Sequence, residues 1–208
     1  VDGGEGGTGA APLEFSNSVG MPLREALSFV SDVLIGFDLK KDIKVIASGK
    51  TFSGFHLVKN LALGADMCNS ARGMMVALGC MQSLECNTNK CPTGITTQDP
   101  KLTRGLVVPD KAERVARYHN ATVNSALEII ASAGLRNTSD LNRTHIFRRV
   151  SQTEVRRFDE IYQSPVLGSF FNEEAPPKFA QALKESCAES FFPKQYVAET
   201  TEGLKEVS

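Results

Sequence analysis

The sequence predicts an α/β fold built around a parallel β-sheet. β-branched residues are concentrated in residues 43–49 (IKVIASG), and a second short strand is expected over residues 65–71 (ADMCNSA). Apolar residues recur at helical spacing in residues 53–65 and again from residue 73 to about residue 84. Strand, helix, strand and helix therefore follow one another, an order typical of strands that pair in parallel.

Further helices are expected on both sides of this segment. Residues 21–39 carry apolar side chains at helical spacing. Residues 110–135 form the longest amphipathic stretch, with Asp110 as the expected N-cap and Gly134 as the expected stop. Residues 136–150 predict a short capping helix, after which the pattern weakens.

Composition excludes several classes of protein. The chain has 208 residues, 41% of them apolar, and a formal net charge of −1, which gives no basic excess for nucleic acid. No apolar run reaches the roughly 18 residues that cross a bilayer, so no membrane partner is expected. The five cysteines are an odd number and a poor basis for a secreted disulfide framework. We therefore expect a cytoplasmic protein with reduced thiols.

Two loops after the predicted strands favour a phosphate. Gly49 ends the first strand, and residues 69–73 (NSARG) join the second strand to its helix, where free backbone N–H groups favour an anion. Arg72 either binds that anion or is a solvated arginine of the first helical turn. The glycine-rich residues 2–12 (DGGEGGTGAAP) indicate either close approach to a ligand or a flexible segment.

Three cysteines fall within twelve residues, as Cys80, Cys86 and Cys91 in the pattern C-x5-C-x4-C-P. The helix must end before Cys86 for the sulfurs to converge, and the intervening NTNK supplies a turn. Structural zinc sites use four ligands in tighter pairs, so zinc fits badly. A three-iron cluster suits three thiolates, and three inert buried thiols are the alternative.

A resemblance to a known family rests on the stretches GGEGGTGAAP, LGAD with the 69–73 loop, GCMQSLECNTNKCPTGITTQDP and, more weakly, AGLRNTSDL. They resemble the carboxyl-terminal half of the synthase domain of glutamate synthase, in particular the FMN-binding glutamate synthase family, over roughly residues 3–145. The resemblance implies a (βα)8 TIM barrel that binds FMN and a [3Fe-4S] cluster. Residues 1–150 would then be the carboxyl-terminal half of the barrel with an iron–sulfur loop, and residues 151–208 a helical extension.

The resemblance also implies residue roles, although it assigns no catalytic residue. Cys80, Cys86 and Cys91 would hold the cluster, and two loops would hold the flavin phosphate: Ser48, Gly49 and Lys50 on one side, and Ser70, Ala71 and Arg72 on the other. The large synthases have Asp-Gly-Gly at the first loop and Gly-Thr within the second. The basic residues of this chain at those places predict a more cationic pocket.

The activity that the resemblance implies is formation of glutamate from 2-oxoglutarate and ammonia, with electrons passing from a donor through the cluster to FMN. Two alternatives stay open. One is an FMN-binding barrel oxidoreductase that acts on another substrate. The other is a non-catalytic electron-transfer or metal-binding fragment. No glutaminase signature is visible, so ammonia is expected to come free or from another subunit.

Two strands are expected where a barrel needs eight. We therefore expect a partial barrel that has no synthase activity alone. It would require the missing amino-terminal half of the barrel, a second copy of itself or a partner chain, because the edge and faces of a parallel sheet are normally covered.

Overall fold

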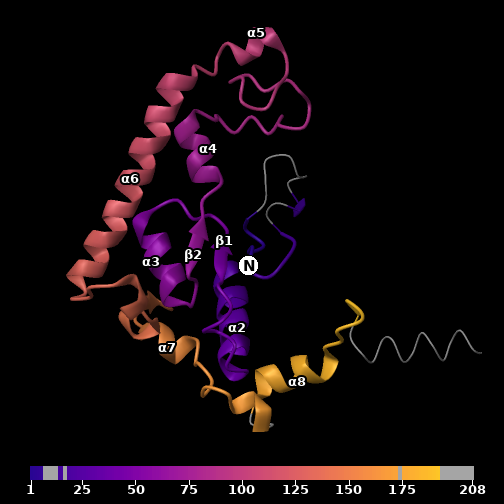
Figure 1. The fold of residues 1–208 in the computed structure, drawn as a ribbon, viewed down its shortest axis with the longest axis vertical. Coiled ribbons are helices and arrows are strands. Elements are labelled where there is room, and N and C mark those ends of the chain that lie inside the picture. Colours follow the sequence, from indigo (N-terminus) through magenta and orange to yellow (C-terminus); the bar gives the residue numbers. More distant parts are fainter. Residues whose placement is uncertain (7–13, 16–17, 173–174, 193–208) are drawn as a thin grey trace, which may run out of the picture. The chain divides into compact units, whose positions relative to one another are not determined.

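The computed structural model describes residues 1–6, 14–15, 18–172 and 175–192 (Figure 1). Gly7 and Gly9 of the glycine-rich segment lie outside the described residues. The chain divides into two compact units, one comprising Val1–Ser31 and Asp42–Gln163 and the other Asp32–Lys41 and Ser164–Ser208.

The helices and strands follow in the order α2 (Leu23–Gly36), β1 (Ile46–Ser48), α3 (Gly54–Ala62), β2 (Met67–Asn69), α4 (Arg72–Leu78), α5 (Pro100–Thr103), α6 (Val108–Ser132), η1 (Thr138–Asp140), η2 (Arg143–His145), β3 (Phe147–Arg149), β4 (Val155–Arg157), α7 (Phe158–Ile161), η3 (Ser169–Asn172) and α8 (Pro177–Glu185).

The parallel pairing predicted for the first two strands is confirmed. β1 and β2 pair in parallel, with Ser48 opposite Asn69. The opening residues join on the other side of β1, because Asp2 forms a parallel bridge with Ser48. There the Ser48 amide donates to the Val1 carbonyl at 2.8 Å, and the Gly3 amide donates to the Ser48 carbonyl at 2.9 Å. Three parallel segments therefore lie side by side, one more than the sequence indicated.

Helix α3 packs between the sheet and the long helix α6 (Figure 1). Ser53 caps α3 by accepting a hydrogen bond from the His56 amide at 3.3 Å. Gly54 allows the close approach to α6, because a Cβ there would lie 2.6 Å from the Ala126 nitrogen. Val58 of α3 and Ile130 of α6 are buried, and their burial contributes to the hydrophobic core of this unit.

Two predicted helix ends were wrong. Helix α4 ends at Leu78, about six residues early, because Gly79 adopts a left-handed conformation (φ 109°) and closes the last turn. Helix α6 begins at Val108, with a proline in its first positions, so Asp110 lies in the first turn and Val107 is the N-cap. The stop at Gly134 is confirmed by its φ of +76°.

An antiparallel hairpin was not expected. β3 and β4 pair with Phe147 opposite Arg157. Residues 136–150 form two short 3-10 helices and β3 instead of one helix. Two adjacent arginines occupy the middle of both FRRV and VRRF, so the sequence has no alternation of apolar and polar residues to reveal the strands. Phe158 follows β4 directly, and its amide donates to the Ile146 carbonyl before β3 at 2.9 Å.

The second unit is held by aromatic rings. Phe170 lies 5.4 Å from Phe37 and 5.2 Å from Phe179, measured between ring centroids. Gly36 permits this packing, because a Cβ there would lie 2.5 Å from the Phe170 ring. The described residues after 163 therefore pack into a folded unit, and helix α8 is part of it.

The mixed helix and sheet content confirms the α/β class. The described residues contain two small open sheets, each of two strands, and the TIM barrel remains a prediction. In the described part of the chain, no helix combines the length and apolar character that crossing a bilayer requires.

Gly64 offers a test of this packing. Its φ is +110°, and a Cβ there would lie 2.1 Å from the Ser31 Oγ, whereas Gly134 has a φ of +76° and open space around it. Gly134→Ala should lower the free energy of unfolding by about 1 to 2 kcal/mol through backbone strain alone. Gly64→Ala should cost at least about 1 kcal/mol more, because it adds a clash to the strain. Urea unfolding of both variants measures the difference, and equal losses would contradict the close contact with Ser31.

Candidate functional site

A cavity of about 120 Å³ lies at the carboxyl ends of β1 and β2. Five of the six residues predicted to hold a phosphate line it: Ser48, Gly49, Lys50, Ala71 and Arg72. The structure therefore brings the two predicted loops together. The remaining lining residues, which were not individually predicted, are Asp2, Gly6, Thr51, Asn69 and Gly73. Asn69 and Gly73 belong to the 69–73 loop expected to bind an anion, and Asp2 and Gly6 belong to the glycine-rich segment.

Ser70, the sixth predicted residue, stabilises the cavity through a hydrogen bond between the two loops. Its hydroxyl donates to the Thr51 carbonyl at 2.5 Å and so joins the two loops directly. The Thr51 hydroxyl accepts a hydrogen bond from the Asn60 side chain at 3.1 Å. Thr51 and Asn60 are 3% and 1% exposed, so this bond is shielded from water. Buried polar groups that are bonded in this way hold a loop in one conformation.

The turn after β1 requires unusual backbone angles. Gly49 has a φ of +142°, a conformation that residues with a side chain rarely adopt. Lys50 follows with a φ of 47°, which is uncommon for a residue other than glycine. These angles turn the chain sharply at the strand end and place both residues in the cavity lining.

The guanidinium of Arg72 holds the glycine-rich segment. Its Nη2 donates to the Glu5 carbonyl at 3.0 Å and to the Gly6 carbonyl. The Glu5 carboxylate in turn accepts from the Leu23 amide at 2.9 Å, at the start of α2. Arg72 thus contributes positive charge to the cavity and also fixes one of its walls. Neither alternative raised by the sequence, a phosphate ligand or a solvated arginine, included this second role.

The residues present fit a phosphate group. A cavity of about 120 Å³ is smaller than the roughly 300 to 1,000 Å³ of sites that enclose a whole ligand, so it suits one end of a nucleotide. Lys50 and Arg72 supply two positive charges against the one carboxylate of Asp2. Gly73 lacks the side chain that would crowd this wall, because a Cβ there would lie 2.8 Å from the Ser70 Oγ.

The three clustered cysteines lie on one segment between α4 and α5. All five cysteines are described, and none forms a disulfide. Within the residues that the structure describes, no group of three or more His, Cys, Asp or Glu side chains is placed to hold a metal ion. Cys80, Cys86 and Cys91 lie on this one segment, and their role as ligands of a cluster stays a prediction.

Cys91 has the environment of a thiolate. It is 6% exposed, and its Sγ lies 3.3 Å from the Thr93 hydroxyl. Hydrogen bonds from the Thr93 hydroxyl and then from the Thr96 backbone lower the pKa of the Cys91 thiol to about 6. Its charged form, which is the form that binds metals, is therefore favoured at neutral pH.

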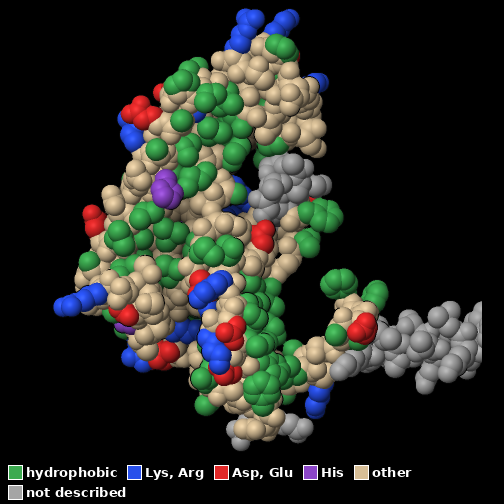
Figure 2. Space-filling view, in the orientation of Figure 1, with side chains coloured by type: hydrophobic (Ala, Val, Ile, Leu, Met, Phe, Trp, Pro, Cys, Tyr) green, Lys and Arg blue, Asp and Glu red, His purple; other side chains and the backbone are tan. Residues whose placement is uncertain are grey.

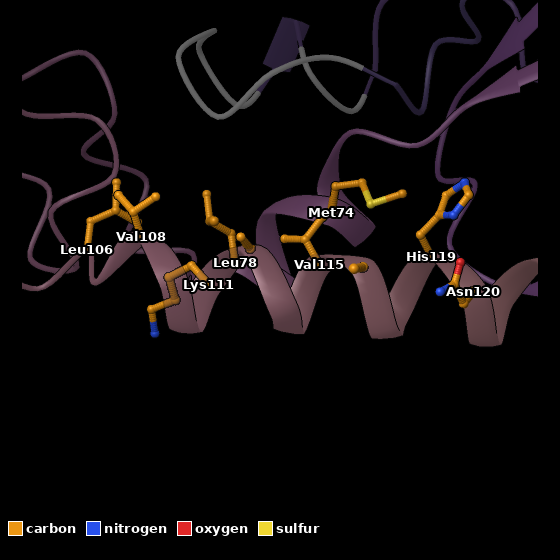
Figure 3. Close-up of a pocket in the computed structure, with 10 residues that line it drawn as sticks. Met74, Leu78, Leu106, Val108, Lys111, Val115, His119 and Asn120 are labelled. Atoms are coloured by element: carbon orange, nitrogen blue, oxygen red, sulfur yellow. The ribbon is translucent and has the colours of Figure 1, made fainter.

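A larger groove of about 630 Å³ lies between α4 and α6. Figure 3 shows Met74, Leu78 and Val115 on the same side of α6, whereas Lys111 points away. The Lys111 ammonium lies 3.5 Å from the Asp110 carboxylate. Hydrophobic side chains also cover part of α4 and α6 in Figure 2. Because its lining is mainly apolar, this groove suits packing against another protein surface better than it suits catalysis.

Residues 1–136 match the conserved region in glutamate synthase. The chain belongs to the glutamate synthase family. The matched residues include the cavity and the cysteine segment.

Relatives within this family carry related names. The chain is 37% identical over 161 residues to glutamate synthase large subunit-like protein YerD of Bacillus subtilis (strain 168), covering 77% of this chain and 31% of that protein. It is 38% identical over 141 residues to the archaeal glutamate synthase [NADPH] of Methanocaldococcus jannaschii, covering 68% and 28%. It is 29% identical over 153 residues to the glutamate synthase [NADPH] large chain of Azospirillum brasilense, covering 73% and 10%. The chain thus spans less than a third of each of these three relatives.

The role of Arg72 in this family member is testable by hydrogen exchange. In Arg72→Ala the glycine-rich segment loses two charge-assisted hydrogen bonds, each worth about 1.5 to 3 kcal/mol. The amides of Gly3, Gly4 and Gly6 should then exchange at least about tenfold faster, as measured by mass spectrometry.

Arg117→Ala is the matched control for this variant. Arg117 is 68% exposed on α6, where it pairs with Glu113 at 3.7 Å. Its removal should leave exchange in residues 2–6 unchanged. Unchanged exchange in Arg72→Ala would show that other contacts hold this wall.

Proposed function

We propose that the chain is part of a glutamate-synthase-like flavoprotein oxidoreductase that forms glutamate from 2-oxoglutarate and ammonia, with FMN and a [3Fe-4S] cluster as cofactors. The observation that carries this proposal is the cationic cavity between two strand-end loops, in a chain whose residues 1–136 match the conserved region in glutamate synthase. Bound there, FMN would supply hydride transfer.

The chain's own residues would bind the phosphate end of FMN. Lys50 supplies a positive charge. Gly49 and Gly73 line the cavity from the two loops. Arg72 keeps the glycine-rich wall in place through the carbonyls of Glu5 and Gly6. A phosphate held from two loops also fixes the orientation of the nucleotide attached to it.

We propose further that residues 1–150 are the carboxyl-terminal half of a (βα)8 barrel and that residues 151–208 are an extension. Three parallel segments with α2 and α3 between them agree with consecutive βα units. Ile46 and Met67 are 40% and 50% exposed on the strands, whereas parallel sheets are normally covered on both faces. The chain would therefore require the amino-terminal half of the barrel or a second copy, and alone would be inactive.

The cluster is proposed on chemistry rather than on the present geometry. A preformed metal site rarely exists in an unfolded chain, so metal binding can supply free energy that orders the ligands. Three thiols lie on one segment, and Cys91 is favoured as a thiolate. Such thiols can bind iron, and we propose that cluster binding orders this loop.

The partners follow from this activity. 2-Oxoglutarate and ammonia would be the small-molecule substrates, and an electron donor would reduce the enzyme. The names of the relatives from Methanocaldococcus jannaschii and Azospirillum brasilense include NADPH, which makes a nicotinamide cofactor the first donor to test. We place the complete protein in the cytoplasm, where thiols stay reduced.

An absorbance spectrum and an activity assay on the complete protein test this proposal. The purified protein should show flavin bands with a broad iron–sulfur shoulder and should form glutamate from 2-oxoglutarate and ammonia when reduced. Cys86→Ser should lose the shoulder and keep the flavin bands, since it removes one of three proposed thiolate ligands.

Cys187→Ser is the control, because Cys187 lies outside the cysteine segment, and its spectrum should match that of the wild type. Flavin and cluster absorbance without glutamate formation would favour another substrate. A protein with neither absorbance would contradict both cofactors.

A further inference from the structure

Helix α6 contributes a tyrosine that forms a hydrogen bond with the loop after β1, beside the cavity. The Tyr118 hydroxyl donates to the Phe52 carbonyl at 2.9 Å, 66 residues away in the sequence. The same hydroxyl lies where a side chain at position 73 would be, because a Cβ on Gly73 would come within 2.3 Å of it. Tyr118 thus contacts the loop after β1 and closely approaches the loop after β2.

The two places that Tyr118 approaches belong to the two loops that line the cavity. Phe52 directly follows Thr51, which lines the wall formed by the first loop. Gly73 lines the wall formed by the second loop. The bond from the Ser70 hydroxyl to the Thr51 carbonyl joins the two loops directly. Tyr118 adds a second restraint, because it bonds to the first loop and packs closely against Gly73 of the second.

We propose that Tyr118 is a positioning residue that makes the cavity selective for a phosphorylated flavin over the same flavin without phosphate. This inference rests on the proposed function, because it takes the cavity as the site for the FMN phosphate. A phosphate must meet donors from both loops at once, and such a group of donors must be held within about 0.5 Å. Riboflavin has no phosphate, so its binding does not depend on the spacing of the walls.

The test compares FMN with riboflavin in Tyr118→Phe. The phenyl ring keeps the bulk of the side chain and removes only the hydroxyl. Dissociation constants for both flavins are measured from flavin fluorescence with the complete protein. FMN affinity should fall about three- to tenfold, the effect of one lost hydrogen bond, while riboflavin affinity stays unchanged.

Tyr162→Phe is the matched control. The Tyr162 hydroxyl donates to the Glu25 carboxylate at 3.1 Å, and neither residue lines the cavity. This variant should leave the ratio of FMN to riboflavin affinity at the wild-type value. The comparison separates the loss of any tyrosine hydrogen bond from the loss of this one.

A second variant tests the same contact from the other wall. Gly73→Ala places a methyl group against the Tyr118 hydroxyl and should weaken FMN binding more than Tyr118→Phe does. Removing the hydroxyl gives that methyl group room, so the double variant should bind FMN more tightly than Gly73→Ala alone. Rescue is expected to be partial, since the Ser70 Oγ also lies 2.8 Å from the added Cβ. Additive losses would show that the two residues do not interact.

The outcomes separate this inference from the proposed function. A wild-type protein that binds FMN no more tightly than riboflavin would contradict the phosphate cavity itself. A wild-type protein that prefers FMN, with the same preference in Tyr118→Phe, would overturn only the role of Tyr118. Equal weakening of both flavins in Tyr118→Phe would mean that the tyrosine stabilises the fold and does not position the walls, which also overturns the inference.

Discussion

The candidate site depends on the parallel pairing of three chain segments whose ends meet at one edge. Ser48 is central to this pairing, because its amide and carbonyl both bond to the opening residues while β2 pairs on its other side. Parallel strands place their carboxyl ends together, so the loops that follow β1 and β2 become neighbours without any contact between distant side chains. The lining, charge and size of the cavity follow from that arrangement.

Polar side chains then convert neighbouring loops into fixed walls. Ser70 comes from the loop after β2, Asn60 from α3 and Tyr118 from α6, and each bonds to Thr51 or Phe52. Arg72 bonds in the same manner to the glycine-rich segment. Such bonds matter most where water is excluded, because an unsatisfied polar group is costly there. Arg72 thus supplies positive charge to the cavity and also holds the glycine-rich segment that forms part of its lining.

The sequence predicted those parts of the fold that depend on local pattern. β-branched runs revealed β1, and Gly49 revealed the turn after it, because glycine is favoured at a φ of +142°. The opening segment has too few residues to show a strand pattern, so its pairing with Ser48 was missed. The bonds of Arg72 were missed because they reach residues 66 and 67 positions away. The cysteine pattern suggested a cluster, but thiol positions also depend on the loop conformation, which spacing alone does not determine.

We expect the cavity between residues 48–50 and 70–72 to hold the phosphate of FMN. A crystal structure of the complete protein with FMN tests it most directly, because phosphorus is readily located in electron density. Phosphate oxygens should lie within hydrogen-bonding distance of backbone N–H groups from both loops, with the Lys50 ammonium close by and Arg72 still bonded to the glycine-rich segment. An FMN phosphate bound elsewhere on the protein, with this cavity filled only by water, would contradict the account.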